Sequence, residues 1–163
     1  MSYELRALAA RDEIAAQAAD AIGSVLISLT QGIGLVPVTA ELLDDLSDDA
    51  GRAYPDAFWF LTARLAERAA TVSAAGAVAY LEADIFGGTG TQAVVVWRAG
   101  QVVLGPARTE FRAGADHRDD AINRALRELG VAASATGDEF AALGLGGWRH
   151  TGDWLTADDA ATS

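Results

Sequence analysis

Residues 77–106 contain three runs rich in β-branched and aromatic side chains, separated by very short turns. The runs are AVAYLEADIF (77–86), TQAVVVWR (91–98) and QVVLGP (101–106). Turns this short join only antiparallel neighbours, because a parallel connection needs a crossover of about a dozen residues or more. The pattern therefore predicts a three-stranded antiparallel meander.

The first of these turns, Gly87-Gly88-Thr89-Gly90, has the glycine content of a phosphate-binding loop. A P-loop needs a lysine and then Ser or Thr after its second glycine, and this sequence contains no lysine. A dinucleotide-binding motif leads from a strand into a helix, whereas residues 91–97 favour a strand. We therefore expect the glycines to supply positive φ angles in a hairpin, with phosphate binding as the less favoured alternative.

The spacing of apolar residues and helix-capping residues predicts the other elements. A short strand is expected at residues 3–7 and a hairpin at 24–29 and 33–38, with Pro37 ending its second strand. Helices are expected at residues 10–22, 40–49, 56–73, 116–129 and 138–143.

Strands and helices do not alternate singly, as βαβ units would require. We therefore predict an α+β fold, with a mostly antiparallel sheet (hairpin plus three-stranded meander) and helices packed on one face. The length predicts a single domain over residues 1–155, and the polar end predicts a disordered acidic tail over 156–163.

Composition narrows the classes of function. The net charge is −11, and the twelve basic residues, all arginine, form no cluster, which argues against nucleic-acid binding. The absence of cysteine excludes disulfides and thiolate chemistry. The charged start argues against a secretory signal, and no apolar run reaches the roughly 18 residues of a membrane span. We expect a soluble cytoplasmic protein that binds neither nucleic acid nor membrane and needs no cofactor.

Glu82 and Asp84 are two residues apart on a predicted strand and therefore share one face with Tyr80. The favoured interpretation is that both are solvated acids on an exposed sheet face. A carboxylate pair can also recognise a partner, hold a hard cation or do acid–base work, with Gln92 on the neighbouring strand as a helper. These three alternative roles stay open beside the favoured interpretation.

A second acidic group, Asp116, His117, Asp119 and Asp120, precedes a predicted helix. We favour helix capping there, because acids in a first turn complement the helix dipole. No metal site is predicted. The segment 40–49 is also acidic and contains no basic residue; its acids are Glu41, Asp44, Asp45, Asp48 and Asp49.

Aromatic residues in two segments are candidates for a binding surface, since Trp and Arg are favoured at interfaces. One is the tail, with Trp148, Arg149, His150, Asp153 and Trp154. It either packs on the core or forms an exposed patch. The other is Trp59 and Phe60: Phe60 falls on the polar side of the expected helix and Trp59 on its flank, so another segment covers them or they belong to an interface.

The stretches AYLEADIFGGTGTQAVVVW, INRALRELGV and DEFAALGLGGWRHTGDW resemble a group of small uncharacterised proteins from high-GC bacteria. In size, acidity and layout the chain is also similar to the immunity proteins that neutralise bacterial toxins. The second resemblance implies an intracellular protein that binds another protein.

Three functions remain. The leading hypothesis is a non-enzymatic, immunity-like protein that occludes a partner protein by steric and electrostatic contact, with a basic partner favoured by the acidic charge. The alternatives are a small-molecule or metal-binding protein or enzyme with a carboxylate site beside the 87–90 turn, and a structural homo-oligomer such as a homodimer. No nucleophile motif such as G-x-S-x-G is present, and this absence favours a protein without catalytic activity over an enzyme.

Overall fold

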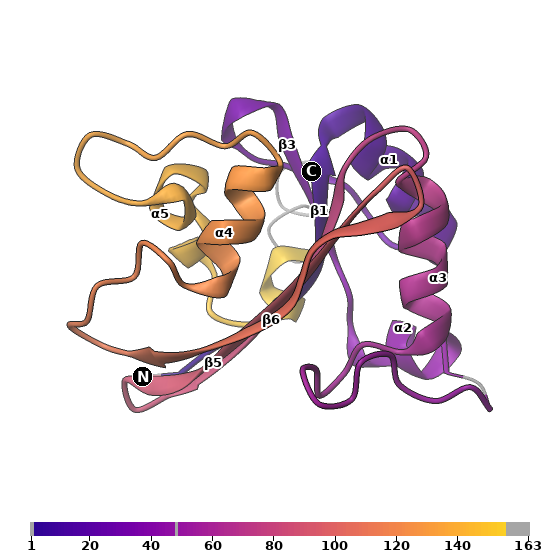
Figure 1. The fold of residues 1–163 in the computed structure, drawn as a ribbon, viewed down its shortest axis with the longest axis horizontal. Coiled ribbons are helices and arrows are strands. Elements are labelled where there is room, and N and C mark those ends of the chain that lie inside the picture. The colour runs from indigo at the N-terminus through magenta and orange to yellow at the C-terminus, as the bar shows by residue number, and fades with distance from the viewer. Residues whose placement is uncertain (1, 48, 156–163) are drawn as a thin grey trace.

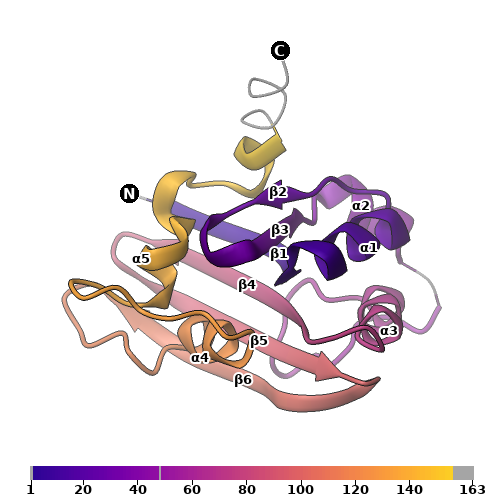
Figure 2. The same ribbon diagram turned by 90° about the horizontal axis from the view of Figure 1, so that it is seen from above.

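The computed structural model describes residues 2–47 and 49–155, and these form one antiparallel sheet with helices on both of its faces (Figures 1 and 2). The strand order is β2-β3-β1-β4-β5-β6. The strands are β1 (Ser2–Arg11), β2 (Ile27–Ser28), β3 (Ile33–Pro37), β4 (Val78–Phe86), β5 (Thr89–Arg98) and β6 (Gln101–Arg112). The predicted acidic tail at 156–163 lies outside the described residues.

The helices connect these strands and cover the sheet. The α-helices are α1 (Asp12–Ile22), α2 (Ala40–Asp45), α3 (Ala63–Val72), α4 (Ala121–Glu128) and α5 (Glu139–Leu143). Single 3₁₀ turns, η1 (Thr30–Gly32) and η2 (Leu145–Gly147), complete the elements. None of the helices in the described ranges is long and apolar enough to cross a membrane.

The α+β class, the hairpin and the meander are confirmed. Gly87 and Gly88 have φ angles of +63° and +82° and form the turn between β4 and β5, where Phe86 pairs with Thr89. The 87–90 segment therefore leads from strand to strand. The last strand is longer than predicted: β6 continues to Arg112, beyond the run that was expected to end at residue 106.

The helices cover two faces of the sheet rather than the single face predicted. One core lies between α1, α2, α3 and strand residues such as Leu8, Tyr80 and Val95. A second core lies between α4, α5 and the alternate strand residues, including Leu81 and Val94 (Figure 1). The reason is visible in β4, where residues 78–83 are all buried, as expected for a strand covered on both sides.

The segment after η2 lies beside the first residues of β1 (Figure 2). β3 pairs only with the second half of β1, from Ala7 to Arg11, so the first half has a free edge. The amide of Glu4 donates to the carbonyl of Arg149 at 2.8 Å, and the amide of Arg6 donates to Thr151 Oγ1 at 3.0 Å. These two hydrogen bonds join residues 149–151 to the first half of β1.

Candidate functional site

Trp59 and Phe60 lie in the loop before α3, not in a helix. α3 begins at Ala63, and Thr62 caps it by accepting a 3.1 Å hydrogen bond from the amide of Leu65. The prediction of a helix from Asp56 is therefore wrong at its start. Phe58 and Leu61 are buried, which gave the loop an apolar spacing like that of a helix.

Glu82 holds the backbone of this loop. Its Oε2 accepts a hydrogen bond from the amide of Trp59 at 2.8 Å, and its Oε1 accepts one from the amide of Phe60 at 3.1 Å. The carboxyl group is not solvated, because Glu82 is only 4% exposed. The interpretation of Glu82 as a surface acid is wrong: the shared face with Tyr80 was predicted, but the loop covers it.

Tyr80 completes the environment of this carboxylate. Its hydroxyl donates a 2.8 Å hydrogen bond to Glu82 Oε1. Burial raises the pKa of the Tyr80 phenol well above its usual value, and the neighbouring Glu82 charge raises it further. The phenol therefore stays protonated and keeps donating. Three donors thus converge on one buried side chain.

The aromatic side chains of the two residues held by Glu82, Trp59 and Phe60, are exposed to solvent. Trp59 is 56% exposed and Phe60 is 40% exposed. Arg108 lies over the Trp59 ring at 5.5 Å and Arg6 lies over the Phe60 ring at 4.4 Å, distances typical of cation–π contacts. The backbone of each residue is thus held by a hydrogen bond to Glu82, and each ring contacts one guanidinium group.

The face of the sheet that carries Glu82 is exposed to solvent beyond the part that this loop covers. Asp84 and Phe86 follow Glu82 at two-residue steps, and both are exposed, Phe86 by 75%. We call the set Trp59, Phe60, Asp84, Phe86 and Glu110 the aromatic surface. Asp84 opposes Thr91 and Thr91 opposes Glu110, so these two acids lie in one row across β4, β5 and β6.

Arg6 and Arg108 are functional candidates that the sequence did not reveal. Register places them in one row with Glu82, since Arg6 opposes Glu82, Glu82 opposes Ala93, and Ala93 opposes Arg108. Neither arginine stands near Trp59 or Phe60 in the sequence. Only the pairing of strands far apart in the chain could have indicated them.

Gln92 does not join the predicted carboxylate site. It opposes Ala83 rather than Glu82, so its side chain lies on the other face of the sheet. There Gln92 Oε1 accepts a 3.0 Å hydrogen bond from the amide of Ile122. The predicted combination of Glu82, Asp84 and Gln92 beside the glycine turn is therefore not formed.

The tail packs on the core through one of its two tryptophans. Trp154 belongs to the second core and is 4% exposed, whereas Trp148 is 43% exposed. The two indole rings meet edge to face, with their centroids 6.4 Å apart. Arg149 and His150 are exposed, and Asp153 is half-buried. The first of the two interpretations of the tail is confirmed for Trp154, and Trp148 remains a surface residue.

Two further acidic candidates belong to α2. Asp44 and Asp45 are exposed at the end of α2, and Asp48 is outside the described residues. Within the described part of the chain, no cluster of three or more His, Asp or Glu side chains could hold a metal ion.

Asp120 occupies the N-cap position of α4, as a capping role requires, but its side chain makes no capping hydrogen bond, and the helix begins at Ala121 rather than at residue 116. The first amides of α4 donate instead to Thr109 and Gln92. Asp116 pairs with Arg118 at 2.6 Å, and this side-chain hydrogen bond lowers the pKa of Asp116 to about 2. Asp120 pairs with His117 at 2.8 Å.

No protein-family model, no curated protein and no solved structure matches this chain. The function must therefore be argued from the geometry of the molecule.

Proposed function

We propose that this protein binds another protein through the aromatic surface and catalyses no reaction, in the manner of an immunity protein. The observation that carries the proposal is the buried Glu82 carboxylate, which accepts hydrogen bonds from the amides of two consecutive exposed aromatic residues. Burying a carboxylate costs free energy that hydrogen bonds must offset. Here the hydrogen bonds that offset this cost also fix the backbone of a surface loop.

A fixed aromatic loop suits a binding surface for a physical reason. Aromatic side chains contribute a large contact area, and they bind more tightly when little flexibility is lost on association. Trp59 and Phe60 are already restrained by Glu82 below and by Arg108 and Arg6 beside them. A partner would therefore order few groups when it covers them.

The charge of the chain favours a basic partner. Its net charge is −11, and Asp84 and Glu110 lie within the aromatic surface itself. The exposed acids of α2 add to the negative electrostatic potential of the protein. Opposite charges accelerate encounter and screening by salt removes the effect, so association with such a partner should slow as salt rises.

Site-specific photo-crosslinking tests the proposal. A photoreactive phenylalanine is placed at Trp59 and, as a matched control, at Val103, which is 42% exposed on β6 outside the aromatic surface. In lysate of the source organism we expect one protein, identified by mass spectrometry, to crosslink from position 59 only. With the purified partner, the association rate constant should fall between about 50 and 300 mM salt.

Two results would contradict the proposal. Equal crosslinking from both positions would show that the contact is not specific to the aromatic surface. A product made of two copies of this chain would replace the foreign partner with a homodimer.

A further inference from the structure

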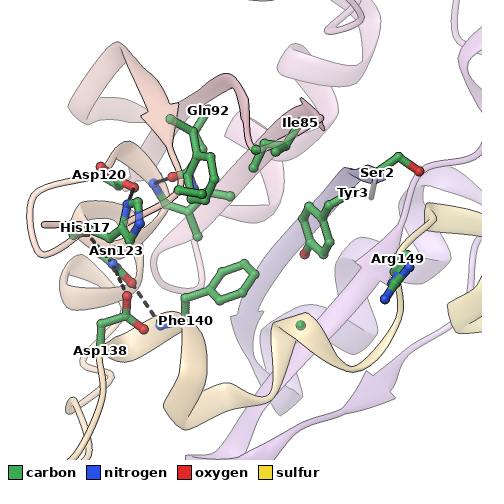
Figure 3. Close-up of a pocket in the computed structure, with 15 residues that line it drawn as sticks. Ser2, Tyr3, Ile85, Gln92, His117, Asp120, Asn123, Asp138, Phe140 and Arg149 are labelled. Atoms are coloured by element: carbon green, nitrogen blue, oxygen red, sulfur yellow. Dashed lines mark hydrogen bonds and ion pairs between the residues drawn. The ribbon is translucent and has the colours of Figure 1, made fainter. Parts of the chain in front are cut away.

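A cavity of about 440 Å³ lies on the opposite face of the sheet from the aromatic surface. It is bounded by the ends of β1, β4, β5 and β6, by the loop before α4, and by α5 with the segment after it (Figure 3). Its volume is in the range of pockets that bind small molecules. The inference that follows is independent of the proposed protein partner, because the two sites lie on different faces.

The walls of the cavity are mainly aromatic. Tyr3 and Phe140 meet edge to face with their ring centroids 5.6 Å apart. Phe111 and His117 stack in parallel, 4.5 Å apart and 7° from coplanar. Rings in these arrangements favour another flat ring between or against them.

Hydrogen-bonding atoms are left over at one end. Gln92 Oε1 is used by the amide of Ile122, but no described residue accepts from the Gln92 amide nitrogen. His117 Nδ1 lies 2.8 Å from Asp120 Oδ2. A carboxylate can only accept, so a neutral His117 carries its proton on Nδ1 and leaves Nε2 as an acceptor. This end therefore offers one donor and one acceptor.

The polar end is held in place by Asn123, whose hydrogen bonds are already used. Its Nδ2 donates to the carbonyl of His117 at 2.8 Å and to Asp138 Oδ2 at 2.9 Å. Its Oδ1 accepts from the amide of Phe140 at 2.9 Å. One side chain thus links the loop that carries His117 to the helix that carries Phe140 (Figure 3).

The two ends of the cavity differ in charge. Asp120 and Asp138 line the end with Gln92 and His117, and these carboxylates disfavour an anion there. Arg149 lies at the opposite end, beyond Tyr3 and Phe140 (Figure 3). No described residue pairs with its guanidinium group, which is suited to a carboxylate. An anionic group is therefore directed towards Arg149.

We propose that this cavity binds a small aromatic carboxylic acid that carries a hydroxyl or ring N–H group at the end opposite its carboxylate. The ring lies among Tyr3, Phe111 and Phe140. The hydroxyl or N–H group donates to His117 Nε2, and the oxygen of a hydroxyl can accept from Gln92. The carboxylate pairs with Arg149.

Three related probes test this assignment by isothermal titration calorimetry. They are para-hydroxycinnamate, cinnamate, which lacks the hydroxyl group, and para-ethylphenol, which lacks the carboxylate. We expect para-hydroxycinnamate to bind with one-to-one stoichiometry and each of the others to bind about tenfold more weakly. If para-hydroxycinnamate does not bind, or if para-ethylphenol binds as tightly, the proposal is overturned.

Variants locate the binding and separate the two ends. Ala113→Trp fills the cavity wall and is expected to abolish binding, whereas Ala115→Trp, exposed in the same loop but not lining the cavity, leaves it unchanged. His117→Phe keeps the ring stack and is expected to weaken para-hydroxycinnamate to the affinity of cinnamate without changing cinnamate itself. Arg149→Gln weakens both acids about tenfold and leaves para-ethylphenol unchanged.

The variants are informative only when folded, which circular dichroism and the melting temperature establish. Unchanged binding by a folded Ala113→Trp variant would place the ligand elsewhere and overturn the proposal. Equal losses for para-hydroxycinnamate and cinnamate in His117→Phe would show a structural role of His117 and overturn the assignment of its Nε2.

Discussion

Replacing Glu82 with alanine lowers the free energy of unfolding by about 3 kcal/mol, because three buried or partly buried donors then lose their acceptor, and an unsatisfied buried donor costs about 1–3 kcal/mol. The donors are the amides of Trp59 and Phe60 and the hydroxyl of Tyr80. Glu82→Gln has a smaller effect, about 1–2 kcal/mol, since the amide keeps one acceptor oxygen but turns an NH₂ group towards a donor. Urea unfolding measures both differences.

Asp84→Asn is the matched control for this prediction. Asp84 lies two residues further along the same face of β4, but it is exposed and no described residue holds its side chain by a hydrogen bond. We expect its substitution to change the free energy of unfolding by less than about 0.5 kcal/mol. Equal effects of Glu82→Gln and Asp84→Asn would mean that the Glu82 carboxylate is not the anchor of the loop.

The second large effect concerns binding rather than stability. Once the partner is purified, Trp59→Ala is expected to weaken its affinity at least about thirtyfold, which corresponds to the loss of about 2 kcal/mol typical of a hot-spot residue. Phe60→Ala acts in the same direction. Neither substitution should change the melting temperature by more than a few degrees, because both residues are exposed and neither belongs to a core.

Trp148→Ala is the control, since Trp148 is 43% exposed but belongs to the tail rather than to the aromatic surface. Its substitution should leave the affinity for the partner unchanged, as surface plasmon resonance can measure. A large loss in Trp148→Ala together with none in Trp59→Ala would move the interface to the tail and refute the proposed function.

Local sequence patterns predicted the parts of the fold that depend on local geometry. The meander followed from three β-prone runs and from turns too short for a crossover, and Gly87 and Gly88 have the positive φ angles expected of that turn. The second layer of helices was not predictable in the same way. Which helices cover each face of β4 depends on segments far away in the sequence, since α1 shares a core with Tyr80 and α4 shares a core with Leu81.

The candidate site was predicted in part. The sequence identified Glu82, Trp59 and Phe60 as separate anomalies, and the structure brings them into one arrangement. Their contact joins residues 22 or more positions apart, so no local spacing could show it. The capping interpretation at 116–120 failed for a related reason: Thr109 and Gln92, from neighbouring strands, already accept from the α4 amides.

The cavity was missed because its parts are scattered along the chain. Tyr3, Phe111 and Phe140 come from the first strand, the last strand and a C-terminal helix. The sequence pattern groups Gln92 with Glu82, whereas the structure places Gln92 on the face of the sheet that carries the cavity. A sequence offers no indication of such a site until the strand order and register are known.

Amide hydrogen exchange at Trp59 and Phe60, followed by NMR, tests the central claim that a buried carboxylate holds these two residues in place. If Glu82 accepts from both amides, they exchange at least about a hundredfold more slowly than unprotected amides, although their side chains face solvent. Protection is lost in Glu82→Gln for at least one of them and retained in Asp84→Asn. Exchange at the unprotected rate in the unaltered protein would contradict the account.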